Sequence, residues 1–160
     1  MTPARRYFED VKVGEITRFG RHEVTREEIV EYAREFDPQP FHLDEAAGRA
    51  SLYGGLIASG WHTGAMFMRM VADHLGPTDA TAGAMGFDDL KWIQPVRPDD
   101  VLSVESEIRE KIELRSRPDL GLVKIESRVG NQRGEVVMSL VSLVLYLRRS
   151  PSLEGRPASE

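Results

Sequence analysis

The residues of this sequence whose types and spacing could do chemistry are an acid and an imidazole five positions apart, Asp37 and His42. Two prolines, Pro38 and Pro40, stand between them. Each proline restricts its own backbone and that of the residue before it, so the pair is expected on a braced segment. A carboxylate and an imidazole held close together can exchange protons near neutral pH. The spacing therefore favours proton-transfer chemistry.

A second stretch follows in which small residues, Ser59 and Gly60, precede an apolar run. The run predicts a helix from Trp61 to Leu75, closed by Gly76-Pro77. Because this helix is apolar around most of its circumference, it is expected to be buried on more than one side. Its free N–H groups could stabilise a negatively charged oxygen. The start of this helix is thus a second candidate for chemistry.

The elements before Asp37 must position it near the start of the predicted helix. A strand is predicted over 15–24 and a helix over 26–36, with Thr25 and Glu28 forming a capping box. After His42, Asp44 is expected to cap a short helix that runs through Ala50, with Gly54-Gly55 ending it. Asp44 is therefore interpreted as a cap in preference to a site residue.

Four strands are predicted after the long helix, over 82–93, 102–114, 123–129 and 136–147. The second and third alternate apolar and polar residues, whereas the last is apolar at both parities and is expected to be covered on both faces. The order predicts an α+β fold, an antiparallel sheet wrapped around one helix at about residues 60–75. We expect one domain over 1–160, with loose ends at 1–6 and 149–160.

The composition narrows the possible functions. The chain has 160 residues, a net charge of −5 and no cysteine. A thiol nucleophile and a disulfide framework are excluded, and a nucleic-acid partner is disfavoured. No pattern suggests a metal site, a signal peptide or a membrane span, so a cytoplasmic location is expected.

The segment Asp37-Pro38-Gln39-Pro40-Phe41-His42-Leu43-Asp44 resembles the Asp-x-Asn-Pro-(aliphatic)-His-x-Asp signature of the MaoC-like, (R)-specific enoyl-CoA hydratases. The order of elements is similar to that family's hot-dog fold. Three positions depart from its pattern: Gln39 replaces Asn, Phe41 replaces an aliphatic residue, and Ser59-Gly60 stands where many members have His-Gly.

The resemblance implies a hydratase or dehydratase that adds water to, or removes it from, the C2–C3 bond of an acyl-CoA thioester. It implies Asp37 and His42 as the catalytic pair and the N–H of Gly60 as the group that polarises the thioester carbonyl. No cofactor is implied beyond coenzyme A as part of the substrate. The candidate substrate-binding residues are Gln39, Phe41, Ser59, Trp61 and His62.

Two other activities stay open at this stage. One is a hot-dog thioesterase, although its usual Asp/Asn-rich loop pattern is absent from this sequence, and the other is a non-catalytic acyl-CoA-binding protein. Asp37 could also be only a turn residue, and His62 only a packed helix histidine. We expect at least a homodimer, because the strand over 136–147 could be buried between the helix and a neighbour. The candidates for binding CoA phosphates are Arg49, Arg69, Lys91 and Arg97.

Overall fold

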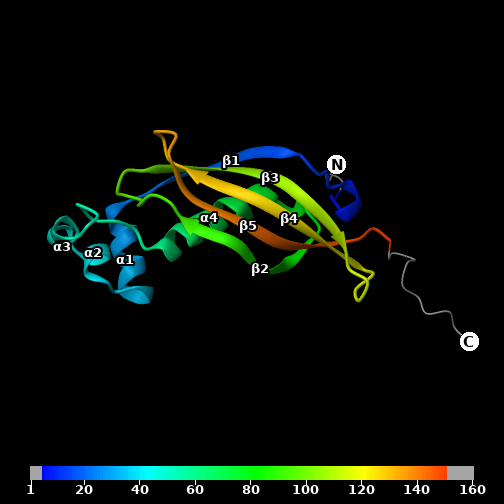
Figure 1. Ribbon diagram of the computed structural model, residues 1–160, viewed down its shortest axis with the longest axis horizontal. Coiled ribbons are helices and arrows are strands. Elements are labelled where there is room, and N and C mark those ends of the chain that lie inside the picture. The colour runs from blue at the N-terminus through cyan, green and yellow to red at the C-terminus, as the bar shows by residue number, and fades with distance from the viewer. Residues whose placement is uncertain (1–4, 151–160) are drawn as a thin grey trace, which may run out of the picture.

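The computed structural model describes residues 5–150 and has five strands in one antiparallel sheet. In chain order these are β1 (Ile16–Glu23), β2 (Thr81–Trp92), β3 (Val101–Glu113), β4 (Leu120–Gly130) and β5 (Val136–Leu147). They lie side by side in the order β1-β3-β4-β5-β2, so β1 and β2 are the edges. The sheet curls around the long helix α4 (Gly60–Leu75) (Figure 1). The α+β class and the helix at the centre are confirmed.

The shorter helices gather at one end of the sheet, near the start of α4 (Figure 1). They are α1 (Arg26–Phe36), α2 (Pro40–Leu43) and α3 (Glu45–Ala50). Away from them are two 3₁₀ turns of the described chain, Phe8–Asp10 before β1 and Gly76–Thr78 after α4. The braced segment from Asp37 to His42 contains a single helical turn, α2, which begins at Pro40. Proline favours the first position of a helix, because its missing N–H would have no partner there.

Capping residues set the ends of α1 and α3. Thr25 accepts a hydrogen bond from the N–H of Glu28 at 3.1 Å, as predicted. Glu28 does not complete a capping box, because its carboxylate binds His22 instead. Asp44 caps α3 by accepting from the N–H of Ala47 at 2.8 Å. The helix α3 ends at Ala50, as predicted.

The main core lies between α4 and the concave face of the sheet. Met66, Phe67 and Met70 of α4 pack there against strand residues such as Val104 and Val137. The opposite face of α4 is open, however, with Trp61 61% and Met68 47% exposed. The expectation of burial on several sides is thus wrong for a single chain. Similarly, no residue of β5 is exposed, but the residues on its outer face are only half-buried.

The described residues nearest the two ends of the chain are better fixed than the sequence indicated. Arg6 pairs with Asp79 in a parallel bridge, and its side chain lies 2.7 Å from the Glu15 carboxylate. Arg149 lies 2.6 Å from Asp10 in an ion pair. These contacts correct the prediction of loose ends for the described parts of 1–6 and 149–160, and the remainder, 1–4 and 151–160, lies outside the described residues. Within residues 5–150, no helix is long and apolar enough to cross a membrane, and the cytoplasmic location stays a prediction.

Candidate active site

Asp37 follows the last residue of α1 and presents its carboxylate to two donors. The Ser59 hydroxyl donates to Oδ2 at 2.6 Å, and the Gln39 amide donates to Oδ1 at 2.7 Å. The Ser59 hydrogen bond, followed by that of Gln39, lowers the pKa of Asp37 below its ordinary value, because both bonds favour the ionised form. The side chain is 22% exposed. Asp37 is therefore an ionised acceptor with solvent access.

His42 lies on the single turn α2 and is buried, with 4% of its surface exposed. Its Nδ1 lies 2.7 Å from the carbonyl oxygen of Ile57. Because a carbonyl can only accept, Nδ1 must carry a proton, so the neutral ring has a free lone pair on Nε2. This Nε2 lies 3.4 Å from Asp37 Oδ2. The backbone thus fixes the tautomer and directs the basic nitrogen toward the acid.

Gly60 is the first residue of α4, and Ser59 is its N-cap. The hydroxyl of an N-cap serine usually accepts from the first turn of its helix, but here it donates to Asp37. Within residues 5–150, the Ser59 side chain makes no capping bond. The N–H groups that open α4 consequently remain available to a ligand, next to the Asp37–His42 pair.

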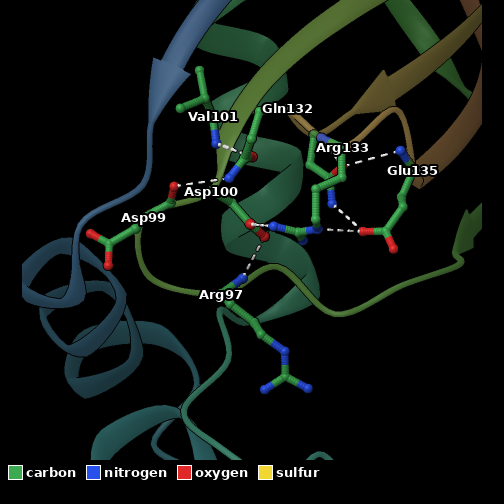
Figure 2. Close-up of polar contacts among 8 residues, drawn as sticks. Arg97, Asp99, Asp100, Val101, Gln132, Arg133 and Glu135 are labelled. Atoms are coloured by element: carbon green, nitrogen blue, oxygen red, sulfur yellow. Dashed lines mark hydrogen bonds and ion pairs between the residues drawn. The ribbon is translucent and has the colours of Figure 1, made fainter.

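The segment before α4 is held by the turn between β2 and β3. The N–H of Ala58 donates to the carbonyl of Val96 at 2.8 Å, and the guanidinium of Arg97 donates to the carbonyl of Tyr53. Figure 2 shows Asp100 between the Arg97 backbone and the Arg133 guanidinium. The Arg97 N–H donates to the Asp100 carboxylate at 2.9 Å, and the Arg133 guanidinium donates to it at 3.0 Å. Because Asp100 is only 1% exposed, this turn is firmly anchored. It holds the segment that carries the Ile57 carbonyl and the Ser59 hydroxyl, which contact His42 and Asp37.

The remaining predicted site residues divide into two groups. Gln39 and Ser59 contact Asp37 directly, and the ring of Phe41 lies edge-on to His42, with the ring centroids 4.6 Å apart. Trp61 is exposed and extends beside Gly60 at the start of α4. The structure therefore brings four of these five residues around the pair and the helix start.

His62, the fifth, turns toward α1. Its ring stacks on Tyr32 with the centroids 4.6 Å apart, and its Nε2 lies 3.6 Å from Glu28. Burial lowers the pKa of His62, although the nearby Glu28 carboxylate opposes this effect. Its Nδ1 is buried and lacks a hydrogen-bond partner among the described residues. This placement is that of a packed helix histidine more than of a group lining the pair.

An apolar cavity of about 230 Å³ lies farther along α4. It opens between the second half of the helix and the inner face of the sheet. Asp37, His42 and Gly60 are not among its lining residues. Those from α4 and the neighbouring strands include Phe19, Phe67, Val71, Phe87, Ile108 and Val144.

Sequence reasoning missed two residues of the site. Ile57 acts through its backbone oxygen, which no sequence pattern reveals. Trp92 ends β2 and donates its indole N–H to the carbonyl of Gly60 at 2.8 Å, across 32 positions of sequence. The only available signal was an aromatic residue at the end of a predicted strand.

Comparison with known proteins supports the interpretation of the fold and signature. The sequence model of the MaoC like domain matches residues 11–130 of this chain. The chain belongs to the MaoC-like family. Its five-stranded sheet and central helix form the hot-dog fold of that family.

Solved MaoC-like proteins have closely similar structures. A MaoC-like dehydratase from Rhodospirillum rubrum is 44% identical, with a TM-score of 0.83, over 91% of this chain and 99% of the other. An (R)-hydratase from Pseudomonas aeruginosa shares the fold at 24% identity, with a TM-score of 0.71 over 96% of each chain. YdeM, an uncharacterised protein of Bacillus subtilis, is 27% identical over 125 residues, which are 78% of this chain and 87% of YdeM.

Proposed function

We propose that this MaoC-like protein is a hydratase or dehydratase that acts across the C2–C3 bond of an acyl-CoA thioester. The observation that carries the proposal is the gap of 3.4 Å between Asp37 Oδ2 and His42 Nε2, beside the open start of α4. A water about 2.8 Å from both atoms forms a triangle with them, within ordinary hydrogen-bond distances. One water can thus contact both proton acceptors at once.

In hydration, the oxygen of this water adds to C3 while His42 Nε2 takes one of its protons. The π electrons of the C2–C3 bond move toward the thioester carbonyl and give an enolate. The imidazolium then returns the proton to C2, so the ring ends neutral and no proton is lost. The ionised Asp37 orients the water and stabilises the imidazolium while it is charged. Dehydration follows the same steps in reverse.

The enolate oxygen requires a donor, and the Gly60 N–H at the start of α4 supplies one in this proposal. The positive end of the helix dipole adds to its effect, because the charge on the oxygen develops only during the reaction. Gln39, Phe41, Ser59 and Trp61 surround the same space, whereas His62 is assigned no contact with the substrate.

Coenzyme A enters as part of the substrate, and the mechanism needs no other cofactor. Of the four cations considered for its phosphates, Arg97 donates to the Tyr53 carbonyl, and Arg69 is paired with Asp73 at 3.0 Å on a later turn of α4. Arg49 is 74% exposed on α3 but is paired with Glu45 at 3.5 Å, whereas Lys91 is exposed beside Trp92 and has no ion pair among residues 5–150. We therefore assign the phosphates to Lys91.

We also infer that the protein works as a homodimer. The edge strand β2 presents Met85 and Phe87, which are 65% and 44% exposed, and the adjacent face of α4 presents Trp61 and Met68. An open edge strand beside an apolar helix face is a surface that a second copy can cover. Light scattering that gives the mass of one 18.0 kDa chain would contradict this inference.

The central experiment follows the loss of enoyl-thioester absorbance with a panel of 2-enoyl-CoA substrates. Asp37→Asn and His42→Ala are each expected to lower kcat at least about a hundredfold, because each removes one partner of the water. Asp44→Asn is the matched control, since Asp44 only caps α3. Wild-type rates in both Asp37→Asn and His42→Ala would remove the pair from the mechanism.

The same assay separates the alternatives. A thioesterase would attack the carbonyl carbon and release free coenzyme A, which a thiol reagent detects, whereas hydration releases none. A binding protein without activity would bind the thioester and leave both absorbance and thiol unchanged.

A further inference from the structure

Trp92 makes a specific contact with the residue proposed to bind the thioester carbonyl. Its indole N–H donates to the carbonyl oxygen of Gly60 at 2.8 Å. The ring comes from the last residue of the edge strand β2. It is 46% exposed in the single chain, so part of the ring is left uncovered by the chain's own atoms.

The indole also explains why position 60 is glycine. A Cβ atom built on Gly60 would lie 2.6 Å from Cε2 and 2.8 Å from Cδ2 of Trp92. These distances are too short for carbon atoms, which approach to about 3.5 Å in packed interiors. The ring therefore lies directly against the Gly60 backbone and closes this side of the helix start.

A second indole supports the first. The ring of Trp61 meets that of Trp92 edge-on, with the centroids 5.2 Å apart, in one of the favoured geometries for aromatic pairs. Both rings are partly exposed and lie beside Gly60, whose N–H has no partner within the helix. The helix start thus has a flat aromatic wall against Gly60, while the neighbouring Ser59 contacts Asp37 of the Asp37–His42 pair.

We propose that Trp92 is a positioning and specificity-determining residue, which fixes the Gly60 peptide and provides the wall along which the planar C2–C3 unit of the thioester lies. The inference rests on the proposed function. An enoyl thioester is flat and conjugated, so it can pack against an aromatic face, whereas a bulky branch near C2 would meet the ring. The wall therefore favours unbranched, unsaturated thioesters.

Substitution of Trp92 tests the positioning role. Trp92→Phe keeps a ring but loses the N–H, and we expect kcat for crotonyl-CoA to fall about three- to tenfold, the value of one hydrogen bond. Trp92→Leu should lower kcat/KM for crotonyl-CoA at least tenfold and lower that for a 2-methyl-branched enoyl-CoA less. Ile93→Ala is the control, because Ile93 is equally exposed next to Trp92. An equal loss for both substrates would overturn the specificity role.

A coupling experiment isolates the contact with Gly60. Gly60→Ala should lower kcat/KM at least tenfold in the wild type, because the methyl group displaces the indole. In the Trp92→Leu background, Gly60→Ala should lower kcat/KM by a clearly smaller factor, because the indole ring that the methyl group would displace is absent. Equal losses in both backgrounds would show that Trp92 does not position Gly60. Light scattering of every variant checks that the assembly is unchanged.

Fluorescence tests the wall without turnover, since Trp61 and Trp92 are the only tryptophans of the chain. In Trp61→Phe combined with His42→Ala, crotonyl-CoA should quench the emission of Trp92, whereas coenzyme A alone should leave it unchanged. Binding seen by calorimetry with unchanged emission would overturn the inference. If the wild type turns over no thioester but crotonyl-CoA still quenches Trp92, the proposed function fails and the wall remains.

Discussion

Removal of the Ser59 hydroxyl tests whether its hydrogen bond keeps the Asp37 carboxylate ionised and oriented. Ser59 is 1% exposed and donates to Asp37 Oδ2 at 2.6 Å. A hydrogen bond to a charged group contributes about 1.5–3 kcal/mol. Because about 1.4 kcal/mol corresponds to a factor of ten, Ser59→Ala should lower kcat/KM about ten- to a hundredfold. The Gln39 bond, at 2.7 Å, remains and limits the loss.

The dependence of the rate on pH gives a second result from the same variant. The Ser59 hydrogen bond is the largest cause that lowers the pKa of Asp37, so its removal raises this pKa toward the ordinary value. Since the proposed mechanism needs the carboxylate ionised, the acid limb of the kcat/KM profile should move to higher pH. The assay is enoyl-CoA hydration followed between pH 4 and 8.

Ser51→Ala is the matched control for this prediction. The Ser51 hydroxyl donates to the carbonyl of Gly48 at 2.6 Å, away from the pair. Ser51→Ala should lower the free energy of unfolding by about 1 kcal/mol and leave the acid limb of the kcat/KM profile unchanged. An unchanged rate and an unchanged acid limb in Ser59→Ala would refute the role given to this hydroxyl.

Three further predictions follow from other parts of the structure. Gly48→Ala should lower the free energy of unfolding in urea by about 2 kcal/mol or more, because a Cβ there would lie 2.5 Å from the Gly55 backbone; wild-type stability would contradict this packing. The free energy of unfolding should fall as pH drops from about 7 to 5. The reason is that burial lowers the pKa of His62 in the folded chain, so near pH 6.5 this histidine binds a proton more readily in the unfolded chain than in the folded one. The slope should be smaller in His62→Phe, and an identical slope would exclude this histidine as its source. Met85→Lys places a charge on the exposed edge of β2 and should give single chains of 18.0 kDa by light scattering, whereas an intact dimer would exclude this edge as the interface.

Much of the fold was predictable because its signals are local. Alternation of apolar and polar residues identified β3 and β4, and the caps Thr25 and Asp44 gave the starts of α1 and α3. The open face of α4 was not predictable, because the sequence pattern of apolar residues is the same whether the chain itself or a second copy covers them. The bridge between Arg6 and Asp79 was missed because it joins residues far apart in sequence.

The site was predictable only in part for the same reason. Asp37 and His42 share a short signature, and the structure places their side chains 3.4 Å apart. The groups that orient them come from later segments, namely the Ile57 carbonyl for His42 and the Ser59 hydroxyl for Asp37. Neither contact follows from spacing, since each depends on how the turn before β3 holds the chain ahead of α4.

The hydrogen bond from the Ser59 hydroxyl to Asp37 has a consequence for the stability of the start of α4. The Ser59 hydroxyl donates to Asp37 and, within residues 5–150, its oxygen accepts no N–H from α4, so the first turn of α4 lacks the stabilisation of about 1 kcal/mol that a serine cap usually gives. Within residues 5–150, the start of α4 therefore keeps backbone N–H groups without a side-chain partner where the reaction is proposed to occur. A ligand oxygen that accepts hydrogen bonds from these N–H groups would take the place of the missing cap. Part of the ligand's binding free energy would then come from stabilising the first turn of α4.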